Sequence, residues 1–179
     1  MKRQDIVFLA RILVFVTLLT HGVSAFSALK PPSPYIDVGA CPFECCVYRK
    51  WLAERTVVVF DQPNGKKVSQ LAKGEWVQAL DGATYSIPLR IVASRDVPEA
   101  SIHPGDVFYV LHYEGESYWL IWFNGKTYDA EAGDKRQPKT TWWVRVKRTD
   151  GSVGWVKAGG GAFSNQDQCG SSPSANVSP

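Results

Sequence analysis

The chain has 179 residues, of which 45% are hydrophobic, and this length allows one ordinary domain or two small ones. Such a hydrophobic fraction can supply a core and argues against global disorder. Lysine and arginine outnumber the acids by 20 to 17, but Lys2, Arg3, Arg11 and Asp5 lie in the first 25 residues, so the remainder carries 17 basic and 16 acidic residues. This balance of +1, without a long basic run, predicts no nucleic-acid partner.

Residues 1–25 have the organisation of a secretory signal peptide. Lys2 and Arg3 give a positive start, residues 12–19 form an apolar centre, and residues 23–25 are small. The alternative is an uncleaved membrane anchor, but the apolar run is shorter than the roughly 20 residues that a membrane span needs. We therefore expect cleavage, export to the periplasm or the extracellular space, and no stable membrane span afterwards.

Residues 26–40 form a lead-in that contains three prolines, which favour extended chain, so we expect a surface tether. Four cysteines follow in the rest of the chain: Cys41, Cys45, Cys46 and Cys169. An even number of cysteines in an exported protein indicates disulfides. Because a bond between the adjacent Cys45 and Cys46 would be strained, Cys41 should pair with one of them and Cys169 with the other. Both pairings remain open.

The central part predicts short strands separated by turns, and no long amphipathic helix. Residues 57–60 predict a buried strand, and residues 76–80 a second one behind the turn Lys73-Gly74-Glu75. Asp81-Gly82 predicts another turn. Residues 87–93 form a further strand, in which Pro88 indicates an edge or a bulge, and residues 94–101 form a polar connector.

Two internal similarities indicate a duplicated β unit. Residues 104–111 resemble residues 73–80, since each segment has a glycine, an acid, a strand and a final leucine. Residues 119–126, which end in Asn-Gly-Lys, resemble the segment from Trp143 to the Asp-Gly pair at 150–151. Between residues 104–111 and 119–126, Glu114 and Glu116 flank a glycine in an expected hairpin, and we predict that both carboxylates are solvated.

Residues 142–156 predict a hairpin around Asp150-Gly151, a pair that tolerates the positive φ angles of a tight turn. Alternation places Trp142 on one face with two valines, and Trp143 on the other face with Arg145 and Lys147. Gly154 would allow another group to approach the backbone closely. Residues 161–179 predict a flexible tail.

These elements resemble the bacterial SH3-like domain family. The first half of the family pattern matches residues 57–80, and the second half matches Trp143, Val146, Asp150-Gly151 and residues 154–156. The family usually joins these halves closely, whereas here they are far apart. The resemblance therefore implies an all-β protein, either with two degenerate SH3-like barrels in tandem, at residues 41–98 and 99–160, or with one barrel that carries a large insertion. We favour two barrels.

The resemblance implies binding rather than catalysis, because exported members dock peptide or cell-wall components. We therefore expect a non-enzymatic binding module or adaptor without cofactor, whose partner is a protein, a peptide or a cell-wall component. Its ligand groove would be formed by surface aromatic residues: Tyr118, Trp119, Tyr128 and Trp143. We expect three further tryptophans in the core: Trp76, Trp142 and Trp155.

Two alternatives remain from the residues themselves. The disulfides and a compact β body also suit an inhibitor of another exported protein. A cysteine hydrolase would need a thiolate beside an imidazole, with Cys45 or Cys46 as nucleophile and His103 or His112 as base. These two histidines show no metal-ligand spacing, so no metal site is expected.

Overall fold

The computed structural model describes residues 30–44, 46–131 and 136–166, and its regular structure is almost entirely β, as predicted. A short 3-10 helix, η2 (Pro98–Ala100), interrupts the strands. The strands are β1 (Tyr35–Val38), β2 (Lys50–Ala53), β3 (Val57–Phe60), β4 (Lys67–Leu71), β5 (Trp76–Ile87), β6 (Leu89–Val92), β7 (Val107–Gly115), β8 (Tyr118–Phe123), β9 (Lys126–Ala130), β10 (Lys139–Arg148), β11 (Val153–Lys157) and β12 (Phe163–Ser164).

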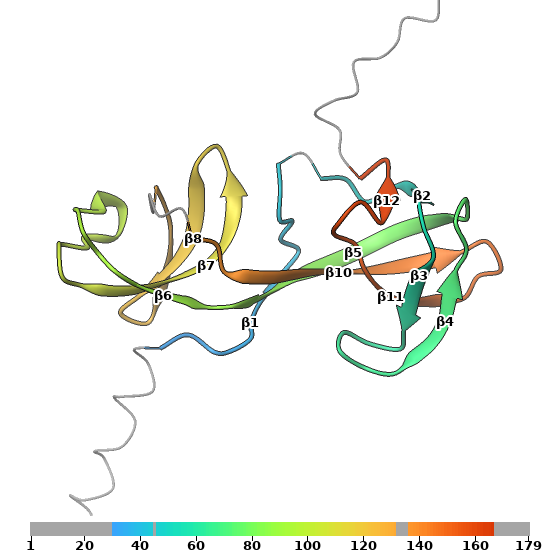
Figure 1. Cartoon of the computed structure of the whole chain (residues 1–179), viewed down its shortest axis with the longest axis horizontal. Helices are drawn as coiled ribbons and strands as arrows, with labels where there is room; N and C mark the ends of the chain where they lie inside the picture. The colour runs from blue at the N-terminus through green and yellow to red at the C-terminus, as the bar shows by residue number, and fades with distance from the viewer. Residues whose placement is uncertain (1–29, 45, 132–135, 167–179) are drawn as a thin grey trace, which may run out of the picture.

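The strands form two sheets at opposite ends of an elongated molecule (Figure 1). The first sheet has the order β12-β2-β5-β10-β11-β3-β4, with β1 paired to β5, and it curls into a half-barrel. The second sheet has the order β6-β7-β8-β9. The long strands β5 and β10 join the two ends, because they stay paired from Lys139↔Ile87 to Arg148↔Val77.

The strand order differs from the predicted tandem division after residue 98. Strands β10 and β11 pair with β5 and β3, so the C-terminal strands belong to the first sheet. Residues 89–130 supply the whole second sheet and are inserted between β5 and β10. Pro88, which has no N–H to donate, separates β5 from β6, and β6 is an edge strand as predicted. The two β units are therefore nested rather than consecutive.

The two units share a turn that the sequence similarity predicted. Gly74 and Gly105 precede the long strands β5 and β7, with φ angles of 84° and 96°. The amide of Gly74 donates to the carbonyl of Ala53 at 2.7 Å, and the amide of Gly105 donates to the carbonyl of Ala93 at 2.8 Å. Each hydrogen bond ties the turn to the end of the strand that pairs with the following long strand, since Ala53 ends β2 and Ala93 directly follows β6. The two turns therefore have the same hydrogen-bond pattern.

The acid after each glycine completes the same turn. The Glu75 carboxylate accepts a hydrogen bond from the amide of Ala72 at 3.0 Å. The Asp106 carboxylate accepts one from the amide of His103 at 2.8 Å. A carboxylate that accepts from a nearby amide stabilises a turn against other conformations. The pattern of Gly followed by an acid therefore marks the same kind of turn in both units.

Each unit has its own hydrophobic core. The core of the first unit is formed by the inner face of the curled sheet and by both chain ends: Trp51, Ala53, Val57, Val59, Leu71, Val77, Ala79, Trp142, Val144, Val146, Val156, Ala158, Ala162 and Phe163. In the second unit, the connector around η2 covers one face of the sheet. The core between them consists of Ile91, Ala93, Val97, Ala100, Ile102, Phe108, Val110, Ile121 and Ala130. The alternation predicted for β10 is confirmed, since its residues 142, 144 and 146 all point inward.

The predicted turn at Asp81-Gly82 is wrong, because both residues lie within β5. Gly82 serves a close approach instead: a Cβ there would lie 2.7 Å from the carbonyl oxygen of Trp143 on β10. The Asp150-Gly151 hairpin is confirmed. Gly151 has a φ of 87°, and the Asp150 carboxylate accepts from the amide of Ser152 at 2.8 Å.

Both ends of the described chain are more ordered than the sequence predicted. Part of the expected tether, residues 26–40, is strand β1, which pairs with β5 from Tyr35↔Ser86 onward. Part of the expected tail, residues 161–179, is strand β12, whose Phe163 packs against Trp51 with ring centroids 5.4 Å apart. The predicted signal peptide, residues 1–25, lies outside the described residues.

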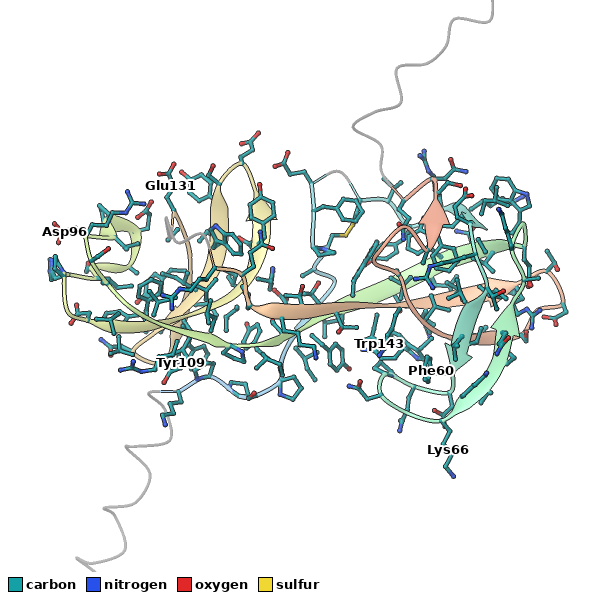
Figure 2. All side chains as sticks on the ribbon, viewed as in Figure 1. Phe60, Lys66, Asp96, Tyr109, Glu131 and Trp143 are labelled. Atoms are coloured by element: carbon teal, nitrogen blue, oxygen red, sulfur yellow. A yellow bond between two sulfur atoms is a disulfide. The ribbon has the colours of Figure 1, made fainter. Side chains whose placement is uncertain are left out.

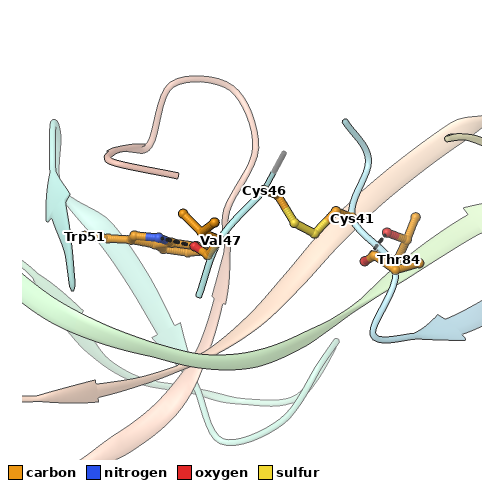
Figure 3. The surroundings of a disulfide bond; sticks show 6 residues. Cys41, Cys46, Val47, Trp51 and Thr84 are labelled. Atoms are coloured by element: carbon orange, nitrogen blue, oxygen red, sulfur yellow. Dashed lines mark hydrogen bonds between the residues drawn. A yellow bond between two sulfur atoms is a disulfide. The ribbon is translucent and has the colours of Figure 1, made fainter. Parts of the chain in front are cut away.

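A disulfide joins Cys41 to Cys46, in agreement with one of the two predicted pairings (Figure 3). Cys45 and Cys169 lie outside the described residues. On one side of the disulfide, the Trp51 indole N–H donates to the carbonyl of Val47 at 2.9 Å. On the other side, the Thr84 hydroxyl donates to the carbonyl of Ala40 at 3.0 Å. The segment that carries the disulfide is thus fixed to both β2 and β5.

Substitution of Gly154 tests whether β11 packs closely against β3. A Cβ at this position would lie 2.3 Å from Cγ1 of Val59, so Gly154→Ala should overpack the core and lower the free energy of unfolding by about 1–3 kcal/mol. At Gly159 a Cβ would meet no atom within 4 Å, so Gly159→Ala should be neutral or slightly stabilising. Urea denaturation of the two variants measures the difference. Equal stabilities would contradict this packing.

Candidate functional site

The four aromatic residues predicted to form a groove lie on different parts of the fold. Tyr118 and Trp119 are on β8, Tyr128 is on β9, and Trp143 is on β10 of the other sheet. Tyr118 is 41% exposed, whereas Tyr128 packs against the second core. Trp119 is half-buried and packs edge-to-face on Tyr113, with ring centroids 5.1 Å apart. The structure therefore does not bring these four rings into one groove.

Trp143 is fully buried, although it shares a face with Arg145 as the alternation predicted. Figure 2 shows Trp143 and Phe60 close together at the curled end of the first sheet. The Phe60 ring lies edge-to-face on Trp143 at 5.2 Å, and Nζ of Lys157 lies 5.1 Å from the Trp143 ring centroid. Phe60 belongs to β3 and Lys157 to β11, so Trp143 packs between neighbouring strands and does not line a ligand groove.

Of the three tryptophans expected in the core, only one lies there. Trp142 is 3% exposed, as predicted. Trp155 is half-buried and lies directly opposite Arg145, so it projects to the outer face of the sheet. Trp76 is 46% exposed, because it alternates with Val77, which takes the core position.

The exposed Trp76 lines a groove of about 740 Å³ on the outer face of the first sheet. Strands β2, β5 and β10 and the start of the β10–β11 turn form this surface, which we call the Trp76 groove. Its lining residues are Lys50, Trp76, Val77, Gln78, Lys147, Arg148 and Thr149.

The strand register places a row of polar side chains across the Trp76 groove. Gln78 of β5 lies opposite Lys50 on β2 and opposite Lys147 on β10. Directly opposed residues project to the same face of a sheet, and so do residues two positions apart on one strand. Lys50, Gln78 and Lys147 therefore form one row, and Trp76 lies beside its middle member.

An ion pair holds the side chain of Arg148 at the rim of this groove. Nε of Arg148 donates to Oε1 of Glu75 at 2.7 Å, and both side chains are largely buried. The other oxygen of Glu75 accepts from the turn amide of Ala72, so one carboxylate fixes both the turn before β5 and the guanidinium. This contact uses Nε of Arg148, so its two terminal amino groups remain able to donate to other acceptors.

The Trp76 groove combines an aromatic surface with cations on two sides. A partly exposed indole offers a large apolar area at low conformational cost. The two lysines offer ammonium groups on flexible stems that reach over the strands. Among the described residues, neither lysine forms an ion pair, whereas Arg145 further along the same face is paired with Asp81. This arrangement suits a ligand that carries both an apolar group and negative charges.

The groups that a cysteine hydrolase would need are placed as follows. Cys46 is bonded to Cys41, so it supplies no thiolate in this structure, and Cys45 lies outside the described residues. His103 is exposed, and its Nδ1 lies 2.8 Å from an Asp96 oxygen, an interaction that raises the pKa of the imidazole. His112 is buried and 2.8 Å from a carboxylate of a distant segment.

Comparisons of the chain with protein-family models, with curated proteins and with solved structures found no match. Within the described part of the chain, no helix has the length and apolar character that crossing a membrane requires.

Trp143 and Trp76, two of the tryptophans on the outer face, should respond differently to truncation. Trp143→Ala removes a fully buried ring and should lower the free energy of unfolding by about 3–5 kcal/mol. Trp76→Ala removes a ring that is 46% exposed and should cost roughly 1 kcal/mol. Thermal and urea unfolding of both variants measure this. A Trp143→Ala variant with unchanged stability would contradict the burial of that ring.

Proposed function

We propose that this protein is an exported, non-enzymatic binding module that docks an extended acidic segment of a partner protein in the Trp76 groove. The observation that carries the proposal is the exposed ring of Trp76 beside the row Lys50–Gln78–Lys147. The sequence-based expectation of a peptide-binding β module agrees with it.

Exposure of Trp76 is unusual within its own sheet. The other tryptophans of β2 and β10, at positions 51, 142 and 143, are at most 3% exposed. Trp76 instead leaves a large apolar surface in water, and Leu80 on the same strand is 37% exposed. Exposed aromatic residues of this kind are over-represented at the centres of protein interfaces, where covering them supplies binding energy.

The positive side chains of the Trp76 groove favour a ligand with negative charge. The chain without its first 25 residues is nearly neutral, yet the groove gathers Lys50 and Lys147 beside Arg148, which is already paired with Glu75. A carboxylate docked there would gain partners and would leave no buried positive charge unpaired. An acidic segment therefore fits better than a neutral or basic one.

The dimensions of the row favour an extended chain. Neighbouring strands lie about 4.8 Å apart, so the row from Lys50 to Lys147 spans about 10 Å across β5. An extended peptide in the polyproline II conformation advances about 3.1 Å per residue and returns to the same face at every third residue, so carboxylates three residues apart would reach both lysines. A segment with an acid, two residues that include an apolar side chain, and a second acid has the matching spacing.

A fluorescence-anisotropy titration with labelled peptides of this pattern tests the proposal. Trp76→Ala should weaken binding by roughly 30-fold or more, as expected for a central interface residue. Tyr118→Ala is the matched control, because this ring on the second sheet has a similar exposure of 41% and should bind normally. The double substitution Lys50→Gln and Lys147→Gln should weaken binding and reduce its dependence on salt.

Undiminished binding by Trp76→Ala, together with weakened binding by Tyr118→Ala, would move the site to the second sheet. Purified cell-wall fragments form a separate arm of the same titration. Binding of neutral wall glycan without any peptide binding would overturn the acidic-peptide proposal.

A further inference from the structure

Three metal-ligating side chains meet where β1 lies against the second unit. Asp37 comes from β1, and His112 and Glu114 come from β7, far away in the sequence. One ligand atom from each residue lies within 4.8 Å of the other two. The His112 side chain is 1% exposed and that of Asp37 is 29% exposed, while Glu114 reaches solvent. The cluster is thus partly enclosed but retains a route for an ion.

The backbone of β7 is irregular at this point. Its pairing with β8 shifts between Val110 and His112 and again between Tyr113 and Gly115. Leu111 and His112 are both buried there, at 0% and 1% exposure. Bulges of this kind re-aim side chains and occur often beside functional sites. Between the two irregularities, the imidazole of His112 contacts Asp37 of β1.

The contacts of His112 orient its ring as in many metal sites. Nδ1 lies 3.1 Å from the carbonyl oxygen of Tyr113, and a carbonyl can only accept a hydrogen bond. Nδ1 is therefore the donor in this contact. Nε2 faces the carboxylates, 2.8 Å from Oδ2 of Asp37, and a metal ion bound there would take the place of the proton in that hydrogen bond. Histidine ligands commonly donate one ring N–H to a backbone carbonyl while the other nitrogen binds the metal.

Two carboxylates lie beside this imidazole. Oδ2 of Asp37 is 2.8 Å from Nε2 of His112, and Glu114 is the third member of the cluster. A divalent cation would stabilise two acidic groups held together in this way.

We propose that Asp37, His112 and Glu114 bind one divalent transition-metal ion, with Zn²⁺ bound more tightly than Mn²⁺ or Mg²⁺. One imidazole and two carboxylates suit these transition ions, and the affinity of such a site rises toward zinc. Zinc–ligand bonds of about 2.0–2.2 Å place tetrahedral ligand atoms about 3.4 Å apart. Small rotations of the two partly exposed carboxylates, of Asp37 and Glu114, suffice for that geometry.

The bound ion would strengthen the connection between β1 and the second unit. Asp37 belongs to a four-residue strand at the N-terminal end of the described chain, and its partners in the sheet are all on β5. The contact of Asp37 with His112 and that of the Tyr35 ring with Trp122, at 6.4 Å, already link β1 to the second unit, and coordination would add Glu114 to this link. This site is separate from the Trp76 groove, so the two proposals can fail independently.

Isothermal titration of the purified protein with ZnCl₂ tests the metal site, after iodoacetamide has blocked any free thiol. We expect one Zn²⁺ per chain, a higher unfolding temperature in its presence, and no comparable effect of MgCl₂ at the same concentration. Asp37→Asn and Glu114→Gln should each weaken Zn²⁺ binding by about tenfold or more. His112→Gln should remove it, and if that buried variant does not fold, the two carboxylate variants decide the question.

The exposed pair His103–Asp96 supplies the matched control. It has the same 2.8 Å contact between imidazole and carboxylate, but its side chains are 74% and 66% exposed. His103→Gln should leave Zn²⁺ binding unchanged. The proposal is overturned if the protein binds no Zn²⁺ saturably, if Asp37→Asn and Glu114→Gln bind it like the parent protein, or if His103→Gln abolishes binding.

Discussion

The pairing of β5 with β10 is the interaction on which the rest of the structure depends. One half of this two-stranded ladder lies in the curled first sheet, where β2 and β11 extend it. The other half carries β1 and leads directly into the second sheet through Pro88. Because the same hydrogen-bonded ladder runs through both regions, the insertion of residues 89–130 does not interrupt the first core. The close pairing of β5 with β10 requires a glycine at position 82, because a Cβ there would lie 2.7 Å from the carbonyl oxygen of Trp143.

Because the second unit is inserted into the first, the two candidate sites lie on different parts of the molecule. The first unit exposes the outer face of β2, β5 and β10, where the Trp76 groove lies. The second unit meets the N-terminal segment, and the cluster of Asp37, His112 and Glu114 lies at that junction. The Glu44 carboxylate adds a second tie there, since it accepts from the amide of Glu116 at the β7–β8 turn at 2.5 Å. The proposed peptide groove and the proposed metal site thus rest on different parts of the fold.

Local chemistry made much of the fold predictable. Asp150-Gly151, the alternation of β10 and the Gly-acid turns before β5 and β7 all follow from preferences that act over a few residues. The candidate sites were harder to predict. Trp143 was expected in a groove and is buried by Phe60, while Trp76 was expected in the core and is exposed. The cluster of Asp37, His112 and Glu114 could not be predicted from the spacing of the histidines, because it contains one histidine and takes its carboxylates from two segments far apart in the sequence.

The all-β class, the turns at Lys73-Gly74-Glu75 and Asp150-Gly151, and the pairing of Cys41 with one of its two neighbouring cysteines could be predicted from the sequence, whereas the turn predicted at Asp81-Gly82 was wrong. These features depend on backbone propensity, side-chain alternation and geometry between residues close in the chain. Only the tertiary structure decided that the second unit is nested within the first, which tryptophans are covered, and which carboxylates surround His112. Each of these outcomes depends on contacts between distant segments, and residue order alone does not specify which segment will cover a given face.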